Sequence, residues 1–135
     1  MKPRRVELRF TIERNLWETT KANGSHGHWS KQAGARKQLR QLAGWTTKAH
    51  RHQPLKTPCR CIAYIQYPTK AEADPANAAG TVKPLIDGIV DAGLIKDDSS
   101  QHLIGPDYRR DKGRSLPGSH DIRLVFTELT DEDHE

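Results

Sequence analysis

The strongest structural signal in this chain is an apolar stripe at helical spacing between Thr81 and Gly93. Residues three and four apart share one face of a helix, so the stripe predicts a helix that buries one side. Its apolar members are Val82, Leu85, Ile86, Ile89 and Val90.

The ends of this helix also have sequence signals. Gly93 stands where a left-handed residue can end a helix, and Leu94 can fold back onto Ile89. Pro84 has no backbone N–H, so it fits the first turn of a helix but would lose a hydrogen bond further inside one. Its position therefore favours a start near Thr81. We expect Asn77 or Thr81 to cap it.

The rest of the chain alternates strand and helix patterns. Residues 6–12, 59–67 and 121–129 alternate as strands do, and 102–108 fits a shorter strand. A weak apolar stripe predicts a helix from Ser30 to about His52. We therefore predict an α+β fold in one domain, residues 1–129, with a small mixed sheet of about four strands and two main helices in the order βαβαββ. Residues 130–135 form an acidic C-terminal tail.

Composition narrows the class of protein. The chain has 135 residues, of which 34% are hydrophobic, and a mean hydropathy of -0.84. Its hydrophobic core must therefore be built from few residues, and dimerisation would help to stabilise the fold. Its longest apolar run falls far short of the roughly 20 residues that span a bilayer, so no membrane segment is expected. Cys59 and Cys61 are one residue apart on a strand and poorly placed to bond each other. They predict core thiols in a reducing, cytoplasmic compartment.

Charge is unevenly distributed along the chain. No acid lies between Glu18 and Glu72, although this stretch contains ten Lys and Arg residues. Such asymmetry favours a polyanion partner over a merely solubilising face. Trp29 either stacks on an exposed base or packs in the core. The candidate DNA-binding residues are Trp29, Lys31, Arg36, Lys37, Arg40, Lys48 and Arg51.

Carboxylates cluster around the Thr81–Gly93 helix. Hard cations such as Mg²⁺ prefer oxygen ligands, and a protein usually supplies one or two carboxylates beside water and substrate phosphate. A lysine among them suits a phosphodiester substrate. The residues concerned are Asp74, Asn77, Lys83, Asp87, Asp97 and Asp98.

These motifs resemble the RusA family of Holliday-junction resolvases over about residues 70–129. The similarity lies in Asp74-Pro-Ala-Asn77, in Lys83, and in the run Asp91-Ala-Gly-Leu-Ile-Lys-Asp97-Asp98. The family signature is D-x-D-N-x-x-K, and its lysine precedes an aspartate by the 15 residues that separate Lys83 from Asp98. Here Ala76 replaces the second Asp of the motif, and Asn77 lies six residues before Lys83 rather than three. Asp74 is the best counterpart of the first ligand, although a gapless alignment places Asn77 there, and Glu72 is a possible substitute.

The resemblance implies roles for these residues. Asp74, Lys83 and Asp98 are the implied catalytic residues. The implied Mg²⁺ ligands are Asp74, Asp97 and Asp98, with Asp97 either contributing a ligand or orienting its neighbour, and Mn²⁺ is a possible substitute. Asn77 and Asp87 would support them. Asp87 lies one helical turn beyond Lys83, close enough to orient its ammonium group or to bind a water next to the ion.

The family consists of small homodimeric Mg²⁺-dependent endonucleases, often encoded by phages. The resemblance therefore implies a homodimer that resolves four-way DNA junctions by paired symmetric cuts during recombination and repair, in the cytoplasm of a bacterium or a phage-infected host. Two alternatives stay open. One is a branched-DNA or flap nuclease of broader specificity, and the other is a junction-binding protein whose catalysis was lost with the missing acid.

Overall fold

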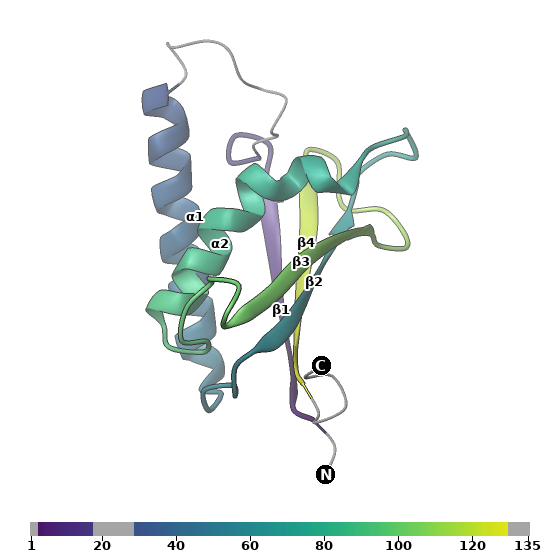
Figure 1. The fold of residues 1–135 in the computed structure, drawn as a ribbon. Coiled ribbons are helices and arrows are strands. Elements are labelled where there is room, and N and C mark those ends of the chain that lie inside the picture. The colour runs from purple at the N-terminus through teal and green to yellow at the C-terminus, as the bar shows by residue number, and fades with distance from the viewer. Residues whose placement is uncertain (1–2, 18–28, 130–135) are drawn as a thin grey trace.

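The computed structural model describes residues 3–17 and 29–129, with side chains from Ala33 onward in the second range. Trp29, Lys31 and the predicted tail at 130–135 are therefore candidates whose side chains lie outside the described residues. The elements follow the predicted order βαβαββ (Figure 1). They are β1 (Arg5–Glu13), α1 (Trp29–His50), β2 (Cys59–Gln66), the 3₁₀ helix η2 (Pro75–Ala78), α2 (Ala79–Asp91), β3 (Leu103–Arg110) and β4 (Ser119–Glu128).

The four strands form one mixed sheet in the order β1-β4-β2-β3. β4 is antiparallel to both β1 and β2, whereas β2 and β3 are parallel. β1, β2 and β3 therefore run in the same direction, and their carboxyl ends lie at the edge of the sheet where β4 begins. The predicted α+β fold with a small mixed sheet is confirmed.

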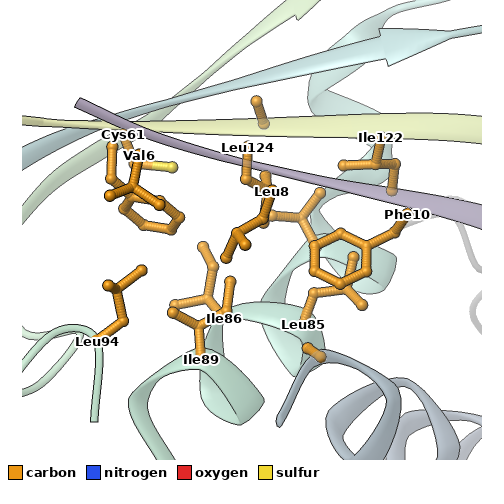
Figure 2. Packing of buried hydrophobic residues seen from close by; sticks show 14 of the residues in the cluster. Val6, Leu8, Phe10, Cys61, Leu85, Ile86, Ile89, Leu94, Ile122 and Leu124 are labelled. Atoms are coloured by element: carbon orange, nitrogen blue, oxygen red, sulfur yellow. The ribbon is translucent and has the colours of Figure 1, made fainter. Parts of the chain in front are cut away.

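The hydrophobic core lies between one face of this sheet and the two helices (Figure 2). Alternate residues of β1 and β4, such as Leu8 and Phe126, point into it and are fully buried. Leu85 and Ile89 of the predicted apolar stripe meet them from α2. Cys59 and Cys61 are buried free thiols, as predicted.

The start of α2 differs from the prediction. The helix begins at Ala79, two residues before Thr81, and contains Pro84 in its interior. Neither Asn77 nor Thr81 caps it, since the N-cap position is occupied by Ala78 and has no side-chain hydrogen bond. Asp74 instead caps the preceding η2, where its Oδ1 accepts a hydrogen bond from the Ala76 amide at 3.0 Å. With Asp74 as cap and Pro75 at the first position of η2, this turn leads directly into α2.

The end of α2 matches the prediction. Gly93 has a φ of +87°, and its amide donates to Val90 O at 2.9 Å. The amide of Leu94 donates to Ile89 O at 3.3 Å. These two bonds form a Schellman motif, and the buried Leu94 side chain packs into the core.

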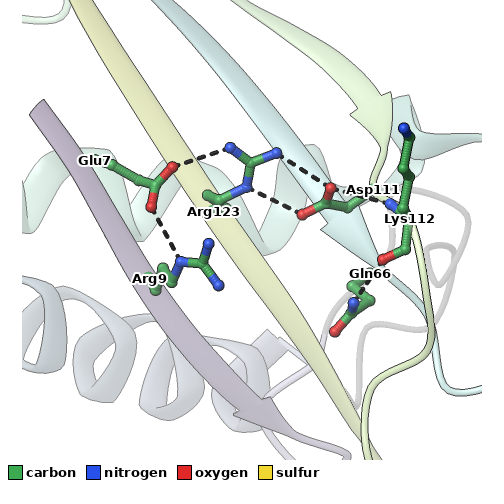
Figure 3. Close-up of polar contacts among 6 residues, drawn as sticks. All are labelled: Glu7, Arg9, Gln66, Asp111, Lys112 and Arg123. Atoms are coloured by element: carbon green, nitrogen blue, oxygen red, sulfur yellow. Dashed lines mark hydrogen bonds and ion pairs between the residues drawn. The ribbon is translucent and has the colours of Figure 1, made fainter. Parts of the chain in front are cut away.

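The other face of the sheet is polar (Figure 3). Arg123 donates to Glu7 at 3.0 Å and to both carboxylate oxygens of Asp111 at 3.1 Å, and its guanidinium lies 4.1 Å from the ring centroid of Tyr64. Arg9 also donates to Glu7, at 3.1 Å. This network joins residues of β1, β2 and β4 and the residue after β3, so it fixes the register of the sheet from outside the core.

No helix among the described residues is long and apolar enough to cross a membrane.

Candidate functional site

The central feature of the candidate site is a lysine held between two aspartates. Lys83 Nζ on α2 donates to Asp87 Oδ1 at 2.8 Å and also to Asp98 Oδ2. Asp87 lies one helical turn further along α2, whereas Asp98 comes from the loop that leads to β3. The prediction that Asp87 orients the Lys83 ammonium group agrees with this contact.

The charges in this cluster reinforce one another. Partial burial lowers the pKa of Lys83, but its hydrogen bonds to Asp87 and Asp98 outweigh burial, so its pKa is raised overall. The hydrogen bond from Lys83 lowers the pKa of Asp98 below its ordinary value. Near neutral pH the group is therefore a cation between carboxylates, and the 61% exposure of the Lys83 side chain leaves it accessible to a ligand.

Asp97 supports Asp98 in this arrangement. Its Oδ1 accepts a hydrogen bond from the backbone amide of Asp98 at 2.8 Å. Of the two roles considered for Asp97, contributing a ligand or orienting its neighbour, the described contact corresponds to the second.

Basic residues of α1 lie beside the cluster. A cavity of about 430 Å³ is lined by Arg36, Lys37 and Arg40 from α1 and by Gly80, Lys83, Pro84 and Asp87 from α2. Arg40 also holds the two helices together, because its guanidinium donates to Asp91 at 2.6 and 2.8 Å. This bidentate bond raises the pKa of Arg40 and lowers that of Asp91.

The remaining predicted DNA contacts lie further along α1. Lys48 is 11 residues after Lys37, a distance of roughly 16 Å along a helix axis. Arg51 follows the end of α1 in a left-handed conformation with a φ of +54°. Trp45, which was not among the predicted DNA contacts, lies on the same helix and is 68% exposed. Its signal in the sequence is an aromatic residue among the polar positions of a basic helix.

Asp74 lines a different cavity, of about 610 Å³. The residues around it are Trp17, Tyr67, Glu72, Ala73, Asp74, Asn77 and Arg110. Since Asn77 lines this cavity and Gly80 lines the other, the two cavities flank the segment that joins η2 to α2. The predicted site residues are thus divided into two sets, with Asp74 and Asn77 in one and Lys83, Asp87 and Asp98 in the other.

Aromatic rings form one wall of the larger cavity. Trp17 stacks on His120 with ring centroids 3.7 Å apart and planes 3° apart, and the edge of Tyr67 meets both rings. Burial lowers the pKa of His120, so its ring is neutral near pH 7. No local sequence pattern predicts this wall, because Trp17, Tyr67 and His120 are far apart in the sequence and meet only through the strand order.

The cluster around Lys83 is chemically suited to a cation, because the carboxylates of Asp87 and Asp98 lie on either side of its ammonium group. Mg²⁺ is commonly held by one or two carboxylates, with water and phosphate as the other ligands, and Asp98 with a neighbouring Asp meets that requirement. Among the described residues, no group of three or more His, Cys, Asp or Glu side chains is arranged to hold a metal ion. Neither a protein-family model nor a curated protein matches this sequence.

Proposed function

We propose that this protein is a Mg²⁺-dependent, structure-selective DNA endonuclease that resolves four-way junctions. The observation that carries the proposal is the position of Lys83, which lies between Asp87 and Asp98 and lines a cavity with Arg36 and Lys37 of α1. A phosphate that enters this cavity meets several cations, next to carboxylates that can hold a divalent ion.

Each residue has a distinct role in the proposed reaction. Asp98, oriented by the adjacent Asp97, would hold Mg²⁺, which would supply hydroxide from a bound water and polarise a phosphoryl oxygen. Lys83 leaves Asp98 for the phosphate and stabilises the negative charge that develops on its oxygens. Asp87 keeps the Lys83 ammonium group in place. The resemblance also assigns Asp74 to the ion, so Asp74 and Asp98 need separate tests.

Arg36 and Lys37 bind the backbone phosphates that flank the cut. Such contacts give affinity and salt dependence without sequence choice. Arg40 mainly stabilises the contact between α1 and α2 through Asp91.

A homodimer fits this reaction, because a four-way junction has two symmetry-related strands to cut. Two identical sites in a fixed relation deliver paired incisions, with each basic subunit contacting half of the DNA. We place the reaction in DNA recombination and repair in the cytoplasm of a bacterium or a phage-infected cell.

One observation favours a second function, which is junction binding without cleavage. Ala76 stands where the resembled motif has an acid, and Asp74 and Asp98 line or adjoin separate cavities. If the missing carboxylate has abolished catalysis, the basic surface would still bind branched DNA. Ala76 is exposed, so Ala76→Asp can restore the acid without disturbing the core.

The proposal is tested with labelled four-way junction, matched linear duplex and flap DNA, each with Mg²⁺ or with EDTA. We expect symmetric, Mg²⁺-dependent nicks confined to the junction. Asp98→Asn should reduce the cleavage rate at least about 100-fold, because mutating a residue that only hydrogen-bonds a metal ligand already reduces activity about 10- to 100-fold. Junction affinity should stay within several-fold. Asp107→Asn is the matched control, since Asp107 is exposed on β3 and lines neither of these cavities.

The possible outcomes separate the hypotheses. Equal cutting of all three substrates favours a branched-DNA nuclease of broad specificity. Tight binding without cutting, with cleavage gained in Ala76→Asp, supports the junction-binding alternative. Loss of activity in Asp74→Asn but not in Asp98→Asn would move the metal to the larger cavity, and absence of both binding and cutting would refute the proposal.

A further inference from the structure

The cavity that contains Asp74 has a position typical of ligand sites. Trp17 follows β1, Tyr67 follows β2, and Arg110 ends β3. These three strands run in the same direction, so the cavity lies beyond their carboxyl ends, where sheets with parallel strands usually bind ligands. Its volume of about 610 Å³ is within the roughly 300–1,000 Å³ of small-molecule sites.

Its aromatic wall is suited to a flat, uncharged ring. Trp17 is fixed by its stack on the neutral His120 ring, and Tyr67 is held by Arg110, whose guanidinium lies 4.8 Å from the Tyr67 ring centroid. Rings fixed in this way stack on a nucleobase without losing much conformational freedom.

Arg110 also positions the acidic rim of the cavity. Its guanidinium donates to the backbone carbonyls of Thr69 at 2.6 Å and Ala71 at 2.7 Å. These bonds hold the segment that presents Glu72, the next residue, at the cavity. Because Arg110 is already engaged and Glu72 and Asp74 are acidic, the cavity does not favour a phosphate group.

The rim instead favours a base edge rich in hydrogen-bond donors. A carboxylate accepts two parallel hydrogen bonds, and guanine is the DNA base whose pairing edge offers adjacent N1–H and N2–H donors. Asn77 also lines the cavity.

We propose that this cavity binds an unpaired guanine base, which stacks on Trp17 and Tyr67 and donates hydrogen bonds to Glu72. The inference rests on the proposed function for its nucleic-acid substrate, and it deepens that function. A flap carries unpaired bases, and bases at the centre of a four-way junction can unpair more easily than those within a continuous duplex. The site therefore selects branched DNA by capturing a base next to the η2–α2 segment that separates it from Lys83.

The test uses single-stranded oligothymidine that contains one central guanine, hypoxanthine, adenine or cytosine. Affinity is measured by fluorescence anisotropy in EDTA, so cleavage plays no part. We expect guanine to bind about tenfold more tightly than plain oligothymidine, in line with hydrogen bonds to a charged group. Hypoxanthine lacks the N2 amine and should lose most of this preference.

Two variants identify the residues that recognise the base. Glu72→Gln should abolish the preference for guanine over the other bases, while Glu13→Gln, also an exposed glutamate, should retain it. Trp17→Leu should weaken binding of every base, because stacking does not depend on base identity; circular dichroism checks that this variant folds.

Equal affinity for all oligonucleotides, or a guanine preference that survives Glu72→Gln, would overturn the proposal. Junction cleavage without base preference would remove only this inference. A Glu72-dependent guanine preference without cleavage would leave the base site standing and remove the nuclease function.

Discussion

Gly88 allows α1 and α2 to pack closely, and replacing it by alanine should destabilise the fold. A Cβ atom at Gly88 would overlap the backbone carbonyl oxygen of Arg40 and lie 3.0 Å from the Cβ of Ala43. Backbone atoms form the main obstacle, so no side-chain rotation relieves it. The helices would have to separate.

The size of the effect follows from that separation. Carbon atoms in contact prefer about 3.5–4.0 Å, so restoring the Ala43 contact alone requires a shift of about 0.5–1 Å. Clearing the Arg40 carbonyl oxygen, which is closer, requires more. A gap of this size forfeits a quarter to a half of each contact across the helix interface. Overpacking costs about 1–3 kcal/mol, and the upper part of that range, about 2–3 kcal/mol, applies here because backbone atoms are the obstacle. Replacing glycine within a helix regains about 1 kcal/mol. We expect a net loss of about 1–2 kcal/mol in the free energy of unfolding.

Urea unfolding followed by circular dichroism measures this loss. With an m-value of about 2 kcal/mol/M, the Gly88→Ala midpoint should fall by about 0.5–1 M. Two glycines of α1 serve as controls. A Cβ at Gly44 would lie 3.5 Å from Gly88 O, an ordinary contact, and one at Gly34 meets nothing within 4 Å. Gly34→Ala should stabilise the protein by about 0.5–1 kcal/mol, and Gly44→Ala should not destabilise it. A Gly88→Ala midpoint equal to or above that of the wild type would refute the reasoning.

Two further predictions concern charge and thiol chemistry. Arg123 lowers the pKa values of Glu7 and Asp111, so its stabilisation is present above their unfolded pKa values of about 4 and is lost as the pH falls through the lowered folded values. Arg123→Gln should therefore lower the urea midpoint near pH 7 but much less near pH 2, and an equal loss at both would contradict the ionic role. Burial raises the pKa of Cys59 to about 11 and that of Cys61 further, so both thiols should resist a thiol reagent at about pH 8 until guanidinium unfolds the chain; rapid reaction of the native protein would show that they are accessible.

The predictable parts of this fold have signals close together in the sequence. Strand alternation located β1 and β4, and Gly93 followed by Leu94 specified the end of α2, because a left-handed cap depends on neighbouring residues. The start of α2 was wrong by two residues. Asp74 followed by Pro75 is itself a cap signal, but the position of Pro84 favoured a later start.

Contacts across the sheet were not predictable in the same way. Arg123 reaches Glu7 and Asp111 because β4 lies between β1 and β2, and this order is not encoded by any local pattern. The same order brings Trp17 onto His120. The Lys83–Asp87 contact was accessible to sequence reasoning, since four residues in a helix make about one turn. The placement of Asp74 in a different cavity from Lys83 was not.

The packing of the two helices links stability to the proposed DNA contact. Arg36 and Lys37 reach the cavity of Lys83 only because α1 lies close against α2, and both Gly88 and the Arg40–Asp91 bond maintain that position. A wider helix separation would move these cations away from a phosphate at Lys83 although no charged residue had changed. If α1 binds phosphate there, the folded Gly88→Ala protein must bind junctions more weakly than Gly44→Ala does. Equal affinities would mean that α1 contacts DNA elsewhere, for example around the exposed Trp45 and Lys48, where the helix position matters less.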